Sequence, residues 1–345
     1  MKRKLLVLFM IFSLMIPFVA CQSENKGNEN NQENNVVTNE QEVEEKEEAK
    51  GDYYPVTITT YNFQGEPVEY TFDKAPEKVV AVYQSSLENL LALGLGDKII
   101  CAAGLDVEVK DEWKDELAKV GKVETDSPSK EAVLEMEPDM ICSWKSYFGE
   151  KKLGDVDFWH DRKIGTYIML NSGIKQPNAL EYEFEDILTL GKIFNKEMEA
   201  QEIVDNMKKD IEGAKEFAKD KDKIKTIIME VEKENQYRNY GGDSIGGNIA
   251  QEVGADLVMP KNGSFGQEEL VELNPEVIFT VYYGDEITPE EAVKGIVDNP
   301  ALQSVDAVKN NRVYGMMLSE VYASGVRTAD GIQSIVKGLY PEFSN

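Results

Sequence analysis

One twelve-residue pattern occurs twice in this chain, and it limits the folds that the chain can adopt. KEAVLEMEPDMI covers residues 130–141, and QEELVELNPEVI covers residues 267–278. Each copy combines apolar residues at helical spacing with a proline that ends the helix, followed by apolar residues typical of a buried strand. Two equivalent helix–strand units predict an α/β fold with two similar lobes, each built around a central, mostly parallel β-sheet.

A glutamate near the start of each copy is also shared. Glu131 and Glu268 lie seven residues before Pro138 and Pro275. A carboxylate in the first turn of a helix is stabilised by the helix dipole, so each glutamate could serve only its own helix. A surface contact with a partner is the alternative, and the pattern by itself leaves both open.

Between the two copies the pattern changes from strand to helix. No strand signal occurs from residue 176 to 222, and apolar residues from Ile203 to Ala218 recur at helical spacing. A helix over residues 196–219 would be about 36 Å long. It could be a surface helix of one domain, but a connection between lobes fits the repeat. We therefore expect an N-terminal lobe over 53–176, a linking helical segment over 177–222 and a C-terminal lobe over 223–345.

The first twenty residues have the pattern of a secretion signal peptide. Basic residues at positions 2–4 precede an uncharged apolar run over 5–19, which is short for a membrane span. The following Cys21 resembles the lipobox cysteine of bacterial lipoproteins, which implies acylation by palmitate-type chains. An ordinary signal peptide followed by cysteine is the alternative. Residues 21–52 are acidic and of low complexity, so we expect a disordered tether that holds an extracytoplasmic body near the cell membrane.

Composition excludes several classes of function. A formal net charge of −27 argues against a nucleic-acid partner. The chain has one histidine, His160, which cannot build a bare transition-metal site alone and is expected on a surface helix. Cys101 and Cys142 lie in apolar runs, so buried thiols are favoured over a disulfide, although export permits either. No H-E-x-x-H motif is present, and His160 is the only histidine that could act as a general base, so we do not expect an enzyme.

A candidate ligand-binding set follows from the ends of the predicted strands, because ligands of α/β sheets bind beyond the carboxyl ends of strands. The set is rich in aromatic side chains, with two arginines. It comprises Tyr83, Trp144, Tyr147, Arg238, Tyr240, Tyr282 and Arg327. Aromatic faces suit a large flat or chelated ligand, and arginine suits anionic edges. Packing in the core or at the rim is the alternative for each aromatic residue.

Residues 53–345 resemble the substrate-binding proteins of ATP-driven importers of the siderophore, heme and cobalamin type. The motifs that carry the resemblance are short and occur in the expected order. They are KAPEKVV at 74–80, LGLGDKI at 93–99, the first copy of the repeat at 131–141, LGKIF at 190–194, AVKNNRVY at 307–314 and LYPE at 339–342.

The resemblance implies two α/β lobes of the class III periplasmic-binding-protein type, joined by one rigid helix, with the ligand in the cleft between them. It implies an ABC permease and its ATPase as partners, with Glu131 and Glu268 docking onto permease arginines. A ferric siderophore is the first choice of ligand, and heme or a corrinoid such as cobalamin is the alternative. We expect a monomer without a resident cofactor. A tetrapyrrole chelatase-like enzyme and a surface adhesin are the rivals from other classes.

Overall fold

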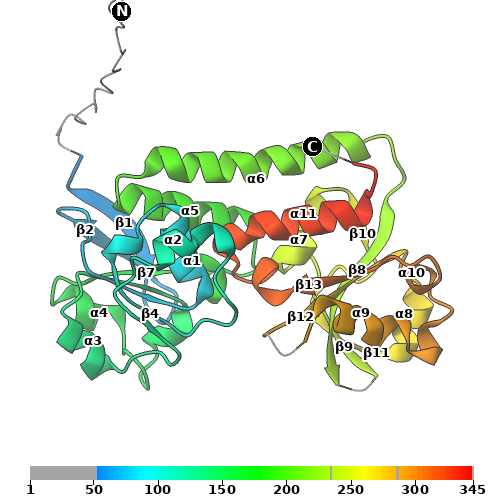
Figure 1. The fold of residues 1–345 in the computed structure, drawn as a ribbon, viewed down its shortest axis with the longest axis horizontal. Coiled ribbons are helices and arrows are strands. Elements are labelled where there is room, and N and C mark those ends of the chain that lie inside the picture. Colours follow the sequence, from blue (N-terminus) through cyan, green and yellow to red (C-terminus); the bar gives the residue numbers. More distant parts are fainter. Residues whose placement is uncertain (1–52, 234, 285–286, 344–345) are drawn as a thin grey trace, which may run out of the picture. The chain divides into compact units, whose positions relative to one another are not determined.

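Two large β-sheets and a two-stranded one organise the part of the chain that the structure describes (Figure 1). The structure is a computed structural model that describes residues 53–343 except 234 and 285–286. The predicted signal peptide, the tether and Cys21 lie outside the described residues. The described residues contain no helix that is long and apolar enough to cross a membrane.

The N-terminal lobe contains a five-stranded, fully parallel sheet in the order β5-β4-β3-β6-β7. The strands are β3 (Val79–Val82), β4 (Ile99–Ala103), β5 (Val123–Glu124), β6 (Met140–Ser143) and β7 (Gly165–Ile168). The helices are α1 (Gln84–Ala92), α2 (Lys114–Leu117), α3 (Lys130–Met136) and α4 (Val156–His160). Before this sheet, β1 (Val56–Tyr61) pairs antiparallel with β2 (Pro67–Phe72) in a hairpin.

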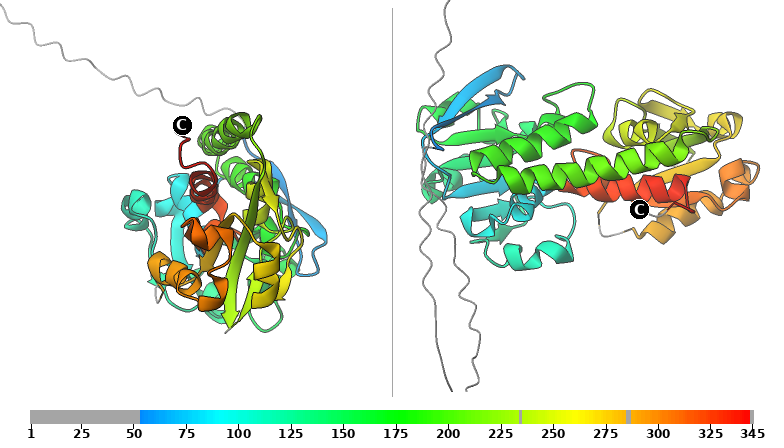
Figure 2. Two further views of the ribbon diagram at one scale, coloured as in Figure 1. Left: turned by 90° about the vertical axis from the view of Figure 1, so that its right-hand side faces the viewer. Right: turned by 90° about the horizontal axis from the view of Figure 1, so that it is seen from above.

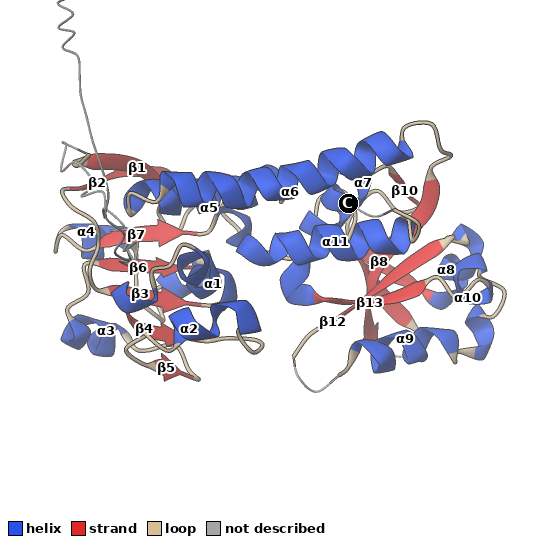
Figure 3. Cartoon of the chain, turned by 45° about the horizontal axis from the view of Figure 1, so that its top comes forward, coloured by secondary structure: helices blue, strands red, loops and turns tan. Residues whose placement is uncertain are grey.

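The C-terminal lobe contains a mixed sheet in the order β11-β9-β8-β12-β13, with β10 also paired to β8. The strands are β8 (Ile224–Lys233), β9 (Gln236–Asn239), β10 (Ala255–Leu257), β11 (Gly263–Gly266), β12 (Val277–Tyr282) and β13 (Val313–Met317). The helices are α7 (Ile245–Glu252), α8 (Gln267–Leu273), α9 (Pro289–Val297), α10 (Asp306–Lys309) and α11 (Thr328–Leu339). Helices flank the strands of both lobes (Figure 3).

The sequence reading missed the antiparallel strands β9 and β11. Arg238 was expected in a loop beyond β8, but it lies within β9, which turns back along β8 and pairs with it antiparallel. β11 then pairs antiparallel with β9 at the edge of the sheet. Both strands are only four residues long, and β9 begins at Gln236, three residues after β8 ends, so they carry too little alternation to predict.

The predicted connecting helix is confirmed as α6 (Glu197–Ala218), an unbroken helix of 22 residues. It follows α5 (Leu180–Ile193) and runs along both lobes beside α11 (Figures 1 and 2). Its buried stripe, which includes Val204, Met207 and Ile211, packs into a core shared by side chains of both lobes. Because this core is continuous, the lobes and the connecting helix are parts of one packed body rather than domains on a flexible linker.

The two copies of the repeat have the same local geometry. Helices α3 and α8 each have seven residues and end at a residue in the left-handed conformation, Glu137 with φ 49° and Asn274 with φ 43°. The acid after each proline then accepts a backbone hydrogen bond at the start of a neighbouring strand. Asp139 accepts from the N–H of Lys78, and Glu276 accepts from the N–H of Lys225, both at 2.9 Å. The repetition in sequence is therefore a repetition of detailed structure.

Candidate ligand-binding site

A pocket of about 190 Å³ lies where loops of the two lobes meet. We call it the aromatic pocket because Trp144, Tyr283 and Tyr322 line it. Its remaining lining residues are Gln84, Ser85, Asp106, Val107, Gly284, Met317, Leu318, Ser319, Ala323 and Ser324. These residues lie at or beyond the carboxyl ends of β3, β4, β6, β12 and β13. The pocket therefore occupies the position expected for a ligand of α/β sheets.

Trp144 forms the N-terminal wall of the aromatic pocket. Its Nε1 donates a hydrogen bond of 2.9 Å to Oγ of Ser85, which fixes the plane of the indole ring. One face of the ring contacts Tyr83 at a centroid distance of 5.0 Å, and Tyr322 of the other lobe approaches edge-on at 6.1 Å. Helix α1 begins at Gln84, and its N-cap residue Tyr83 makes no side-chain hydrogen bond to the start of the helix.

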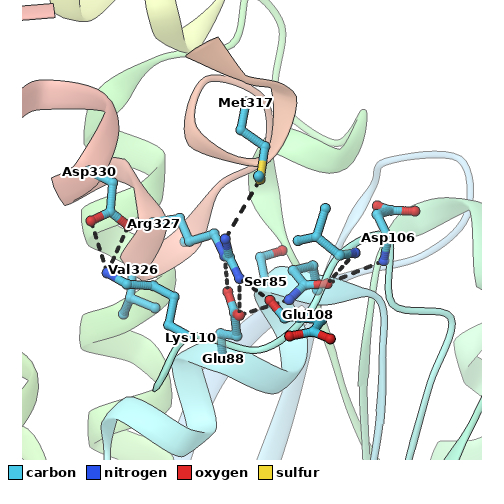
Figure 4. Close-up of polar contacts among 12 residues, drawn as sticks. Ser85, Glu88, Asp106, Glu108, Lys110, Met317, Val326, Arg327 and Asp330 are labelled. Carbon is cyan, nitrogen blue, oxygen red and sulfur yellow. Dashed lines mark hydrogen bonds and ion pairs between the residues drawn. The ribbon is translucent and has the colours of Figure 1, made fainter. Parts of the chain in front are cut away.

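A buried ion pair beneath the pocket joins the two lobes (Figure 4). Nε and Nη2 of Arg327 each donate to a different carboxylate oxygen of Glu88 at 2.6 Å. Nη2 also donates to the carbonyl oxygen of Glu108 at 2.7 Å. Arg327 is 6% exposed and Glu88 is 0% exposed. Because water hardly reaches either group, each charge is neutralised by the other. Arg327 lies outside the pocket lining, and its role as a ligand contact stays a prediction.

Gln84 connects this ion pair to the pocket. Its Nε2 donates to Glu88 at 2.7 Å, while its Oε1 accepts from the backbone N–H groups of Asp106 and Val107 at 3.2 and 3.4 Å. The loop that carries Asp106 is thereby held by the same side chain that contacts the ion pair. The position of this pocket residue therefore depends on the contact between the lobes.

A turn of the C-terminal lobe over residues 323–327 completes the contact between the lobes. Asn89 Oδ1 accepts from the N–H of Val326 at 2.8 Å, and the buried carboxylate of Glu183 accepts from the N–H groups of Ser324 and Gly325. Gly325 has φ +57°, and a Cβ there would lie 2.2 Å from Asn89 Oδ1. Only glycine fits this approach of the two lobes.

A second hollow of about 420 Å³, the polar pocket, shares Tyr322 with the aromatic pocket. Arg238 and Tyr240 line this pocket, but the polar groups of both side chains already have partners in the protein. Arg238 pairs with Glu232 at 2.9 Å, and the Tyr240 hydroxyl donates to Glu230 at 2.7 Å. Burial, aided by Glu230, raises the pKa of Tyr240 well above its usual value, so the hydroxyl stays protonated.

The other predicted contacts lie apart from both pockets. Tyr83 is partly buried behind Trp144, and its hydroxyl accepts from Nζ of Lys152 at 2.7 Å. Tyr147 is buried in the core of the N-terminal lobe, and its hydroxyl donates to the carbonyl of Pro128. Tyr282 ends β12 one residue before the pocket residue Tyr283. Of the seven predicted residues the structure brings only Trp144 to the aromatic pocket and Arg238 and Tyr240 to the polar pocket.

Several pocket residues were absent from the predicted set. Asp106 and Val107 follow β4, so extending the strand-end rule to that strand would have found them. Residues 318–324 follow β13 and begin with a single 3-10 turn, and the predicted set took only Arg327 from this part of the chain. The turn conformation that places this segment against α1 has no simple sequence pattern.

The remaining titratable residues offer no alternative centre. His160 lies in α4 as expected, but it is half-buried, with Nε2 at 2.9 Å from Oγ1 of Thr166 and its ring against Tyr70. Burial lowers the pKa of His160. Cys101 and Cys142 are buried free thiols, as predicted. Across the described residues no group of three or more His, Cys, Asp and Glu side chains is arranged to hold a metal ion.

The two shared glutamates lie outside the lining of both pockets. Glu131 and Glu268 are exposed in the first turns of α3 and α8. Within the described part of the chain neither carboxylate pairs with another side chain, so both are available to a partner. Their role in docking stays a prediction.

Two α/β lobes, one long connecting helix and a pocket formed by loops of both lobes define a ligand-binding protein of the importer type. The chain belongs to the periplasmic binding protein family, whose model matches residues 79–317. Members of this family bind substrates and are not enzymes.

Relatives and solved structures agree with this assignment. The ABC transporter substrate-binding lipoprotein YvrC of Bacillus subtilis is 26% identical over 302 residues, which cover 86% of this chain and 89% of that protein. The petrobactin-binding protein YclQ of the same organism is 29% identical, with 73% of this chain and 78% of that protein covered. A periplasmic binding protein of Veillonella parvula has 32% identity and a TM-score of 0.76, with 84% of this chain and 92% of that chain covered.

Proposed function

We propose that this protein captures a ferric siderophore in the aromatic pocket and delivers it to the permease of an ABC importer. The observation that carries the proposal is a pocket whose walls come from both lobes and present Trp144, Tyr283 and Tyr322. Aromatic faces suit the bulky, partly apolar shell of a metal chelate. The relation to a petrobactin-binding protein supports an iron chelate as the cargo.

The pocket volumes support a cargo that extends beyond the aromatic pocket. That pocket has about 190 Å³, which is less than the usual volume of a ligand site. The polar pocket adds about 420 Å³ on the other side of Tyr322. A chelate of siderophore size would cover Tyr322 and contact both pockets.

Delivery requires a surface for the permease, and we assign it to Glu131 and Glu268. The two carboxylates are exposed and occupy equivalent positions on the two lobes. Arginine side chains on the permease would recognise such carboxylates through charge-assisted hydrogen bonds. Acylation of Cys21 would keep the protein at the cell membrane, where the permease lies.

Heme and a corrinoid are the alternative cargoes, because the same aromatic surface suits a tetrapyrrole. A titration of the full chain in detergent, followed by tryptophan fluorescence, separates these cases, since Trp144 lines the pocket. We expect saturable quenching by at least one ferric siderophore. Saturable quenching by heme or cobalamin alone would replace the siderophore with that cargo, and no binding of any of them would end the proposal.

A further inference from the structure

The charge of the pocket lining limits the cargo more than its shape does. Asp106 is the one charged side chain among the described residues that line the aromatic pocket. Asp106 is exposed at the rim, yet the surrounding protein desolvates its carboxyl enough to raise its pKa. No described cation lies beside it in the pocket lining. The pocket therefore presents a negative charge without a partner.

Arg327 does not reverse this charge. Its guanidinium donates two hydrogen bonds to Glu88 and one to the carbonyl of Glu108 (Figure 4). Contact with an anionic ligand would draw it away from Glu88, and the buried carboxylate would then lose its compensation. Arg327 thus neutralises a buried acid and leaves the pocket without an available positive charge.

Arg238 in the polar pocket is committed in the same way. Its guanidinium lies 2.9 Å from Glu232 and 3.8 Å from Glu230, so two acids surround one base. Among the described residues that line the polar pocket, the one base is therefore already paired with an acid. The formal net charge of −27 adds a long-range field of the same sign, which repels anions from the whole surface.

The aromatic residues favour the opposite charge. Trp144, Tyr283 and Tyr322 present ring faces and edges around the pocket, and Tyr283 and Tyr322 are 64% and 38% exposed. The face of an aromatic ring attracts cations, and the attraction grows where water is excluded. A carboxylate beside several aromatic rings is a set of groups that suits a neutral or cationic ligand.

We infer that this pocket selects metal chelates of zero or positive net charge, and that Asp106 is a determinant of that selection. The inference rests on the proposed function, since it concerns which chelate the binding protein accepts. Among siderophores it favours ferric trihydroxamates, in which three hydroxamate groups cancel the charge of the metal ion. Ferric tris-catecholates carry excess negative charge and are disfavoured, as is heme with its propionates.

Five probes separate the charge of the cargo from its chemical class. They are ferrioxamine B, a cationic trihydroxamate; ferrichrome, a neutral trihydroxamate; ferric enterobactin, an anionic tris-catecholate; heme; and cyanocobalamin, which is neutral. Affinities of the full chain in detergent are measured by fluorescence quenching at low and high salt. We expect a trihydroxamate to bind most tightly, and the preference for ferrioxamine B over ferric enterobactin to shrink as salt screens charge.

The outcomes distinguish the two proposals. Binding of cyanocobalamin alone would support the charge inference and overturn the siderophore proposal. Tightest binding of ferric enterobactin would keep the siderophore proposal and overturn the charge inference. Binding of heme alone, or of no probe, would overturn both.

The variant Asp106→Asn tests the residue itself, and it should fold, because the contacts with Gln84 use the backbone N–H of Asp106. We expect the affinity for ferrioxamine B to fall about fivefold, because the variant loses one electrostatic contact with the cationic ligand near the protein surface. The affinity for ferrichrome should change little, because ferrichrome is neutral. Asp256→Asn is the matched control, because Asp256 is exposed on β10 and lines neither pocket. Equal affinities of the two variants for ferrioxamine B would overturn the assignment of Asp106.

Discussion

The two copies of the repeat begin alike and end differently. In each, a short helix with an exposed glutamate ends in the left-handed conformation, and an acid after the proline binds the start of a neighbouring strand. Beyond the strands the similarity is lost. β6 leads into Trp144 and the buried Tyr147, whereas β12 leads into Tyr283, which is 64% exposed.

This difference suggests that the two ends of the repeated helix–strand unit serve different purposes. The helix end of each copy has kept one geometry, which fits contact with two equivalent surfaces of a partner. The strand end has diverged, because the two walls of one pocket face each other and contact different sides of a ligand. The comparison predicts that changes at the helix ends affect delivery alone, and that changes near the strand ends affect the pocket and the contact between the lobes.

The largest effect is expected from the helix ends. Replacing both Glu131 and Glu268 by alanine should reduce uptake of the labelled chelate by more than tenfold and leave its affinity unchanged, because neither carboxylate lines a pocket. Each single variant should be impaired to a similar degree. Glu135→Ala with Glu272→Ala is the control, since these exposed acids are also equivalent in the two copies. Normal uptake by the first double variant would refute the docking assignment.

The next effect concerns the contact between the lobes. Arg327→Met should lower the free energy of unfolding by about 3–5 kcal/mol, because it leaves the fully buried carboxylate of Glu88 without its partner. Urea denaturation measures this change. The double variant Glu88→Gln with Arg327→Met should regain most of the loss. A small loss in the single variant would mean that the shared core and the turn over 323–327 hold the lobes together without the ion pair.

A smaller effect should appear as a pH dependence of stability. Burial, with Asp330 nearby, raises the pKa of Glu320 in the C-terminal lobe to about 7. Between the usual glutamate pKa and this raised value, the folded protein keeps a proton on Glu320 that the unfolded chain releases. The contribution of Glu320 to the free energy of unfolding is therefore fully present below about pH 4.5 and is lost as pH rises through about 7. Glu320→Gln should therefore gain about 1–3 kcal/mol relative to the wild type between pH 5 and 8. Parallel unfolding curves across this range would contradict the assignment.

The smallest effect concerns the one difference between the helix starts. Oγ of Ser129 accepts from the N–H of Ala132, whereas Gly266 offers no side chain to cap α8. Ser129→Ala should cost about 1 kcal/mol of unfolding free energy, and Gly266→Ser should be neutral or gain a few tenths. The space around Gly266 is open to a Cβ, so no clash is expected. Thermal unfolding of both variants measures these changes. A larger loss of stability from Gly266→Ser than from Ser129→Ala would show that the first turns of α3 and α8 differ in more than the capping residue.

The fold was largely predictable because its signals are local. The periodicity of residues 203–218 and the proline of each repeat mark elements that form from neighbouring residues, and α6 and the repeated units follow them closely. β9 and β11 escaped prediction because their pairing depends on a turn and on partners distant in sequence.

The site was predictable only in part, for a physical reason. Strand ends indicate which loops meet, and this rule found Trp144. It does not indicate which way a side chain turns. Arg327 turned to Glu88 and Tyr147 to the core, because a buried charge needs a partner and a large ring needs packing. Asp106 was missed because the predicted set took no residue from the end of β4.

Helix α6 has a consequence for how the loaded and empty proteins compete. Twenty-two residues of unbroken helix, about 33 Å long, hold the lobes at one spacing, and the shared core restricts their motion further. If Glu131 and Glu268 dock onto the permease, their separation changes little when cargo binds. Empty copies would then occupy the permease almost as readily as loaded ones. Uptake at scarce cargo would fall when this protein is overproduced, because unloaded copies would act as inhibitors of their own importer.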